Sequence, residues 1–275
     1  MTICEYIKNT EYPNPNEKPL DTLLDGGGLT SIFRTVAVIG DSLSSGAITG
    51  SDEKTGKKTR HDMYEYSWGQ YIARIAGCTV YNFSRGGMTA KEYIRSFGEF
   101  YSLFDIKKAA QAYIIALGVN DIKTQEVGCA DDMWDGGPDD TTIAGYYKAI
   151  IKRYKEIQPD GKFFLVTMPR RFDDLPEIRK KREEHRELLW ALSRIYTNTY
   201  VIDLHEYVPE EDADYRRAFY LSGHMNPMGY LLTARMIMSY IDYIIRHNLE
   251  DFIQVPFIGT GSRNYYAKWG NAENE

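Results

Sequence analysis

Residues 35–46 read TVAVIGDSLSSG, an apolar run that turns at Gly40 into small and polar residues. An uninterrupted run of apolar and β-branched residues is typical of a strand buried on both faces, as in a parallel sheet. The polar residues that follow predict a tight turn at the carboxyl end of this strand, with Ser42 exposed above the sheet. By itself the motif fits an ordinary turn serine as well as a nucleophile. It is not the G-x-S-x-G elbow of α/β-hydrolases, because Ser44 stands two residues after Ser42.

The rest of the chain repeats an alternation of short apolar runs with longer helical stretches. Further strands are predicted at residues 79–83, 112–118, 162–168 and 199–204, and helices at about 67–77, 89–100, 141–158, 176–196 and 227–247. This βα order predicts an α/β fold: a three-layer, doubly wound, flavodoxin-like domain around a mostly parallel five-stranded sheet. No repeat or change of composition marks a linker. We therefore expect one domain over residues 1–275, made of an N-terminal arm, a catalytic core and a C-terminal extension (1–34, 35–250 and 251–275).

Composition and charge narrow the class of protein. Of the 275 residues, 43% are hydrophobic and 26% charged, as in ordinary globular proteins. The 33 basic and 39 acidic residues give a net charge of −6, which argues against nucleic acid or an anionic membrane as partner. No apolar stretch has the length of a membrane span or the form of a signal peptide. The three cysteines are widely spaced and show no CxxC pattern, so free thiols and a cytoplasmic location are expected.

Two connections are longer than this fold requires. Residues 47–66 and 122–140 each follow the predicted carboxyl end of a strand, where ligand crevices of open α/β sheets lie. Each is a candidate wall or lid of a pocket, and a tolerated surface insertion is the alternative for both.

Three more polar blocks stand at positions that the topology brings to the same edge. They are SRGG at residues 84–87, GVND at 118–121 and GHMNP at 223–227. In this order, after the block at 40–46, they resemble the blocks of the SGNH (GDSL) hydrolase family, and the resemblance extends over about residues 35–230. It implies the SGNH type of the fold and an esterase or lipase activity.

The resemblance also implies a role for one residue in each block. Ser42 is the expected nucleophile and His224 the base, while the backbone N–H groups of Ser42 and Gly87 and the side-chain amide of Asn120 form an oxyanion hole. The chemistry is consistent, since a serine hydroxyl needs an adjacent base and a neutral imidazole serves near pH 7. Such a site needs no cofactor, and no metal-ligand spacing is present.

The block residues Asp41, Asn82 and Asp121 are expected to brace the turns. One position departs from the family pattern: Leu221 stands where an aspartate usually orients the histidine. Three resolutions are open. A backbone carbonyl near Tyr220 or Leu221, which we favour, accepts the imidazole N–H; Asp203 or Ser222 substitutes for the aspartate; or catalysis is weak.

Four residues are candidates for binding the substrate. Arg85, Arg170 and Arg171 are candidates for binding a carboxylate or phosphate, and Trp134 for stacking on a sugar; ordinary packing or surface positions are the alternative. We expect a serine esterase acting on small acyl groups, such as acetyl esters of carbohydrates. An acyltransferase or thioesterase with the same site, or a weak or inactive binding module, is the alternative. The partner is then a small-molecule or carbohydrate ester. The terminal arms either pack on their own domain or form a homo-oligomer interface.

Overall fold

The computed structural model describes residues 16–262, and its centre is a parallel five-stranded sheet. The strand order is β4-β1-β5-β6-β7. When the five strands are numbered along the chain, this is 2-1-3-4-5, the flavodoxin-like order. Adjacent strands pair in parallel, with Val38 opposite both Asn82 and Ile114. The predicted fold class is confirmed. The strands are β1 (Thr35–Gly40), β4 (Thr79–Asn82), β5 (Ala112–Ala116), β6 (Lys162–Val166) and β7 (Thr199–Ile202).

Helices cover both faces of the sheet, which explains why its strands read as continuous apolar runs. One face packs against α3 (Trp68–Ala76) and α10 (Pro227–His247), and the other against α6 (Ile143–Ile157) and α7 (Pro176–Ile195). The shorter elements are η1 (Gly28–Ile32), α2 (Ser42–Ser45), η2 (Tyr64–Tyr66), η4 (Ile106–Lys108), η5 (Asp121–Lys123), α8 (Leu204–Tyr207), α9 (Ala213–Phe219), α11 (Leu249–Phe252) and η6 (Val255–Phe257).

The helices begin where the sequence offers capping residues. Asn226 caps α10 by accepting the Gly229 N–H, and Pro227 occupies the first turn. The helix predicted at 89–100 differs in detail: α4 (Ala90–Glu92) and α5 (Gly98–Phe100) flank a π-helical turn, η3 (Tyr93–Phe97). Gly98 packs so tightly on the Phe104 ring that a Cβ would lie 2.4 Å from it. The conformation of residues 90–100 thus depends on close packing as well as on helical periodicity.

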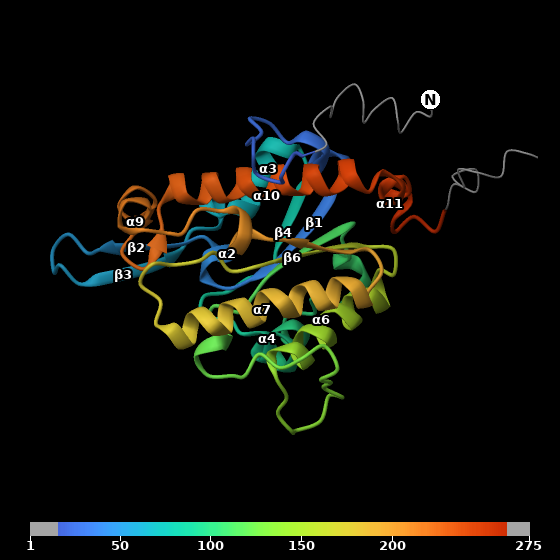
Figure 1. Ribbon diagram of the computed structural model, residues 1–275, viewed down its shortest axis with the longest axis horizontal. Coiled ribbons are helices and arrows are strands. Elements are labelled where there is room, and N and C mark those ends of the chain that lie inside the picture. The colour runs from blue at the N-terminus through green and yellow to red at the C-terminus, as the bar shows by residue number, and fades with distance from the viewer. Residues whose placement is uncertain (1–15, 263–275) are drawn as a thin grey trace, which may run out of the picture.

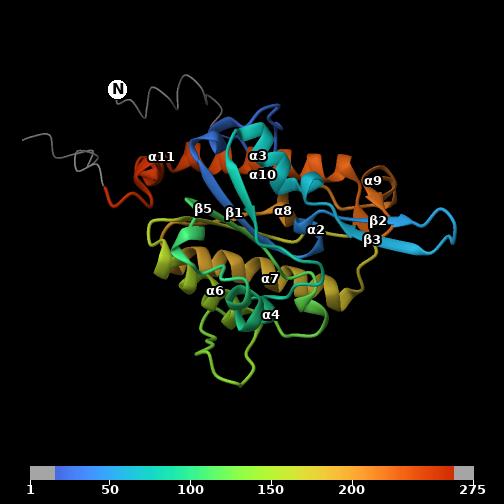
Figure 2. The ribbon, with the colours of Figure 1, turned by 180° about the vertical axis from the view of Figure 1, so that it is seen from behind.

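The two long connections, residues 47–66 and 122–140, differ in structure and position. Residues 47–66 contain an antiparallel hairpin, β2 (Ala47–Ser51) and β3 (Lys58–Asp62), which projects at one end of the molecule (Figures 1 and 2). Residues 122–140 extend instead beyond α4 and α6, where Arg95 donates to the carbonyls of Pro138 and Asp139. The first connection reaches the predicted site through a second hairpin of β8 (Tyr220–Leu221) and β9 (His224–Met225) that contacts β2. The second connection touches the site only at its start, where Lys123 lies 3.4 Å from Asn120 Oδ1.

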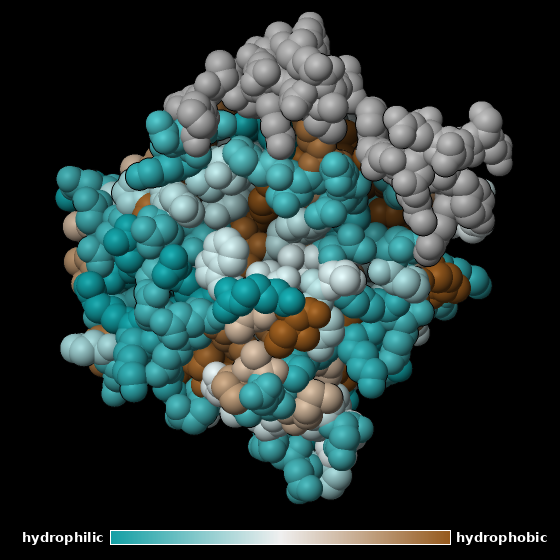
Figure 3. Space-filling model, turned by 45° about the vertical axis from the view of Figure 1, so that its right-hand side comes forward, coloured by the Kyte–Doolittle hydropathy of each residue, from teal (hydrophilic) through white to brown (hydrophobic). Residues whose placement is uncertain are grey.

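The described parts of both terminal segments pack on their own chain. The Leu29 N–H donates to Asp242 of α10 at 2.7 Å, and Val255 accepts from the Gln111 side chain at 2.9 Å. Residues 1–15 and 263–275 of the predicted arms lie outside the described residues. The face in Figure 3 is mainly hydrophilic with smaller hydrophobic areas, as is ordinary for a protein surface. Among residues 16–262, no helix is both long and apolar enough to cross a membrane.

Candidate active site

The nucleophile candidate Ser42 is the first residue of α2, directly after the turn that ends β1. Asp41 precedes it as N-cap and accepts the Leu43 N–H at 2.9 Å. A Cβ at Gly40 would lie 2.2 Å from Ser44 Oγ, so the turn requires glycine there. Ser42 itself is half-buried. The end of the strand and the start of the helix thus hold its backbone at the carboxyl edge of the sheet.

The oxyanion-hole candidate Gly87 lies in the exposed turn after β4. Its φ of +78° is a conformation that residues with a side chain rarely adopt. Asn82 ties this turn to α2, because its Nδ2 donates to the Ser44 carbonyl and its Oδ1 accepts the Ser84 N–H, both at 3.1 Å. The prediction that Asn82 braces the turns is confirmed.

Asn120 joins the ends of three strands. It follows β5, and its Nδ2 donates to the Met88 carbonyl at 3.1 Å and lies 3.4 Å from Asp41 Oδ2. Met88 follows Gly87 directly, so the predicted donors after β1, β4 and β5 are brought together. A side-chain amide carries two hydrogens. Both are directed at acceptors within the protein, the one toward Asp41 across the longer contact.

Two buried carboxyl groups support these turns. Burial raises the pKa of Asp41 to about 6. Burial also raises the pKa of Asp121 to about 6, and the nearby Asp41 carboxyl adds to the increase. Asp121 accepts the Ala90 N–H at 2.7 Å and so holds the start of α4 against the end of β5. The structure thus places Asp41 and Asp121 beneath the site as braces, as the sequence predicts.

The base candidate His224 lies in the small β8–β9 hairpin, where it pairs with Leu221. Strand β9 contacts α2 and β2, which brings the imidazole to the helix that carries Ser42. Among the hydrogen bonds of residues 16–262, none joins Ser42 Oγ to the ring, whose partner is another side chain. Catalytic hydrogen bonds are often long without substrate and tighten when it binds.

That partner is Thr49 of β2, whose Oγ1 lies 3.0 Å from His224 Nδ1. The prediction that a backbone carbonyl near Tyr220 or Leu221 accepts the imidazole N–H is therefore wrong. Leu221 is 44% exposed and supplies no acceptor from its side chain. When Thr49 accepts the Nδ1 proton, Nε2 is left unprotonated and able to take the proton of a serine. Sequence reasoning predicts the connection at 47–66 as a pocket wall or a surface insertion, but it does not single out Thr49, which lies 175 residues from His224 in the chain.

Two charged residues of β3 act on the imidazole with opposite sign. Burial lowers the pKa of His224 below its usual value, the positive charge of Arg60 lowers it further, and the negative charge of Asp62 raises it. Asp62 is held in place by the Ser45 hydroxyl, which donates to its Oδ1 at 2.7 Å. The net effect favours neutral imidazole, the form that a general base requires.

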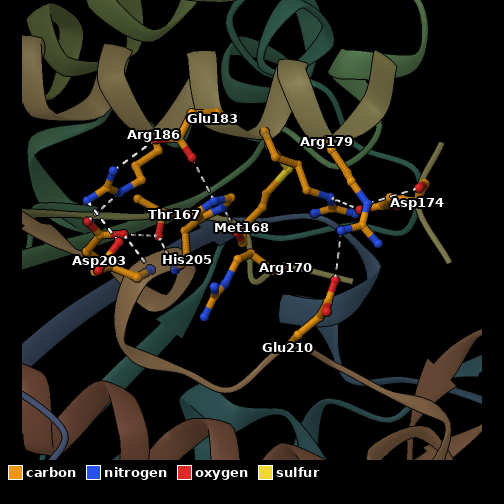
Figure 4. A network of polar contacts seen from close by, with 12 residues as sticks. Thr167, Met168, Arg170, Asp174, Arg179, Glu183, Arg186, Asp203, His205 and Glu210 are labelled. Atoms are coloured by element: carbon orange, nitrogen blue, oxygen red, sulfur yellow. Dashed lines mark hydrogen bonds and ion pairs between the residues drawn. The ribbon is translucent and has the colours of Figure 1, made fainter. Parts of the chain in front are cut away.

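Asp203, the other acidic candidate for orienting the histidine, belongs to a different network, shown in Figure 4. Its Oδ2 accepts from Arg186 and from the Trp190 indole, both at 2.8 Å, and its Oδ1 accepts from the Thr167 hydroxyl at 3.0 Å. Nearby, His205 lies 2.9 Å from a Glu183 carboxylate oxygen. The Asp203 carboxylate thus binds Thr167, after β6, and two side chains of α7, and it does not orient His224.

The predicted substrate-binding side chains make contacts within the protein. Arg85 forms an ion pair with Glu92, and Arg171 pairs with Asp173 at 3.0 Å. Arg170 donates to the Val208 carbonyl, and Trp134 packs on Tyr146 with ring centroids 5.7 Å apart. The structure therefore favours the packing alternative for these four residues.

An apolar cavity of about 70 Å³ lies beside α2, toward α10. Neither Ser42 nor His224 lines it, although Leu43 and Met225 do. Its other walls come from the carboxyl ends of β5 and β6 and from α10, including Val166, Met168 and Ile237. Asp41 of the nucleophile turn and Thr167 of the Asp203 network also line it.

Comparison with known proteins places this geometry in a family. The model of the GDSL-like lipase/acylhydrolase family matches residues 38–232, which include all four sequence blocks. No curated protein matches the chain by sequence.

Solved structures share the fold at low sequence identity. A family two carbohydrate esterase from Clostridium thermocellum, in complex with cellohexaose, has a TM-score of 0.56 and 17% identity, over 79% of this chain and 65% of that one. A family 2 carbohydrate esterase with a carbohydrate-binding domain from Corynascus thermopiles has a TM-score of 0.53 and 18% identity, over 77% and 66%. A possible lipase from Chitinophaga pinensis has a TM-score of 0.52 and 19% identity, over 78% and 98%.

Proposed function

Because the chain belongs to the GDSL-like lipase/acylhydrolase family and is a hydrolase acting on ester bonds, we propose that Ser42 is its nucleophile and that small acyl esters of carbohydrates are its substrates. The observation that carries the proposal is the meeting of the four blocks at one edge of the sheet. Asn120 contacts Asp41 and Met88, and His224 contacts the hairpin next to α2. The likeness to carbohydrate esterases supports the choice of substrate class.

In the first half of the reaction, His224 takes the Ser42 proton and Ser42 Oγ attacks the ester carbonyl. The carbonyl oxygen becomes negatively charged, and the N–H groups of Ser42 and Gly87 together with the Asn120 amide stabilise it. The protonated imidazole then gives its proton to the leaving alcohol, and the acyl group remains on Ser42. In the second half, water attacks the acyl-enzyme with His224 again as base, which releases the acid and restores Ser42.

An acyltransferase or a thioesterase would use the same residues with another acceptor or leaving group. A weak or inactive binding module is the alternative from a different class. The Thr49 contact argues against it, since it supplies an acceptor for His224 that the Leu221 position lacks.

The test is hydrolysis of p-nitrophenyl acetate and of a longer-chain p-nitrophenyl ester by the wild type and by Ser42→Ala, from pH 5 to 9. We expect turnover of the acetate by the wild type, a rise with pH that follows a histidine-like pKa, and a loss of at least about 10⁴-fold in the variant. Preference for the longer ester would contradict the small acyl group. Equal activity of the variant would contradict the role of Ser42.

A further inference from the structure

Arg60 lies on the face of the β2–β3 hairpin that meets the active site. It is the direct cross-strand partner of Thr49, and side chains of such pairs stand on the same face of the two strands. Thr49 contacts His224 from this face. The positive charge of Arg60 also acts to lower the pKa of both His224 and Asp41.

The guanidinium lies against the turn that carries the oxyanion-hole candidate. A Cβ added to Gly86 would stand 2.4 Å from Arg60 Nη2, so the absence of a side chain at residue 86 gives the guanidinium its place. Gly87 follows directly, and its backbone N–H is one of the proposed oxyanion donors. A group bound to Arg60 would therefore lie next to the ester being cleaved.

Arg60 has no acidic partner within the described chain, and its guanidinium lies against the Gly86-Gly87 turn. Within residues 16–262 it makes neither a hydrogen bond nor an ion pair within 4.0 Å, and the nearby Asp62 binds the Ser45 hydroxyl instead. Most other arginines of the described chain pair with carboxylates, among them Arg85, Arg153, Arg171, Arg182, Arg186, Arg235 and Arg246. Arg170, by contrast, donates to a backbone carbonyl away from the catalytic candidates. An exposed guanidinium with its donors free, beside a catalytic centre, is suited to a carboxylate, whose two oxygens match its planar fork.

An unpaired cation at this position opposes the reaction in the free enzyme. His224 must become positively charged when it takes the serine proton, and Arg60 disfavours that charge. The other charged group that acts on the ring is Asp62, also on β3; β2 offers the uncharged Thr49, and α2 begins after the buried Asp41. A substrate carboxylate bound to Arg60 would neutralise the cation and remove this opposition.

We infer that Arg60 binds a carboxylate of the substrate, so that the preferred esters are those with a carboxylate group near the scissile acyl group. This inference rests on the proposed function and narrows its substrate class to anionic esters, such as acylated sugar acids. Arg60 acts here as a specificity-determining residue and takes no part in bond breaking.

The experiment compares 3- and 4-acetoxybenzoate with the corresponding uncharged acetoxybenzamides, so that substrates differ only in one charge. We expect the wild type to have a kcat/KM for at least one acetoxybenzoate about tenfold or more above that for its amide. In Arg60→Met this ratio falls to about one, and Arg60→Lys retains part of it because the charge remains without the fork. Lys58→Met is the matched control, since Lys58 lies on the same face of β3 opposite Ser51, farther from His224, and its ratio stays at the wild-type value.

The pH dependence gives a readout that a purely structural role would not change. With the preferred anionic ester, the apparent pKa of the base is higher in the kcat profile than in the kcat/KM profile, because the bound carboxylate neutralises Arg60. With the amide the two values agree.

The results separate the two proposals. Equal kcat/KM of the wild type for the benzoates and the amides would overturn the inference and leave the esterase intact. A preference that survives in Arg60→Met, with a folded variant, would also overturn it. If Arg60→Met does not fold, Arg60→Lys and the wild-type comparison still decide. No hydrolysis of any of these esters, together with no labelling of Ser42 by a fluorophosphonate, would overturn both proposals.

Discussion

The sheet edge and the β2–β3 hairpin contribute to the candidate site in different ways. Asp41 and Asp121 at the edge are buried and bound to backbone N–H groups, whereas Arg60 and Asp62 on the hairpin are exposed. The edge holds the proposed nucleophile and the proposed oxyanion donors, while the hairpin supplies the partner of the proposed base and the charges around it. The proposed base, His224, therefore has its hydrogen-bond partner on an element outside the core sheet.

Apart from the loss of Ser42 itself, the largest effect is expected at the sheet edge, from Asn120→Ala. The variant loses one of three oxyanion donors, which lowers kcat by about 10²- to 10³-fold with a small change in KM. Steady-state kinetics with p-nitrophenyl acetate measure it, and a melting temperature near that of the wild type excludes unfolding. A kcat within about threefold of the wild type would remove Asn120 from the oxyanion hole.

The buried carboxyl groups at the edge make one contribution to the pH dependence of the free energy of unfolding. The folded pKa of Asp121, about 6, lies above the ordinary 3.8, so the folded state binds more protons between these values. The free energy of unfolding therefore falls as pH rises from about 4 to 6, by about 2–3 kcal/mol for this group. Urea unfolding at both pH values should show a smaller decline in Asp121→Asn, which keeps an acceptor for the Ala90 N–H. The exposed Asp139→Asn is the control, and an unchanged decline in Asp121→Asn would refute the assignment.

Thr49→Val removes the hairpin's hydrogen bond to His224 while keeping the side-chain shape. Since such a bond contributes about 1 kcal/mol, we expect kcat to fall by about fivefold to tenfold. Thr49→Ser should recover most of the activity. Thr59→Val is the matched control, because Thr59 pairs with Gly50 and belongs to the opposite face of the hairpin. Equal kinetics of Thr49→Val and the wild type would show that something else orients the base.

The smallest effect is a pair of opposite shifts in the pH profile. Asp62→Asn removes a negative charge that favours the imidazolium, so the pKa of His224 falls and activity persists to lower pH. Arg60→Met removes a positive charge, so the pKa of His224 rises. As the pH is lowered, activity therefore begins to fall at a higher pH than in the wild type. Each shift in kcat/KM for a neutral ester should be below about one pH unit and should shrink in high salt. Shifts of the same sign in both variants would contradict the electrostatic account.

Sequence reasoning could predict the sheet edge but not the hairpin. The strands are continuous apolar runs, and each candidate at the edge follows a strand end, so their meeting follows from parallel topology. Thr49 and Arg60 carry no such signal. They lie in a mostly polar segment, and their place beside His224 depends on how two hairpins pack, a contact between parts of the chain far apart in sequence. The same limit applies to Trp134 and Arg171, which are candidates by residue type and by their place after strand ends, and whose side chains make other contacts.

The most direct test of the central claim is to treat the protein with a fluorophosphonate and locate the adduct by peptide mass spectrometry. The account predicts one modified residue, Ser42, with labelling much slower in His224→Ala because the base is lost. No adduct, or an adduct on another serine labelled equally in both proteins, would contradict it.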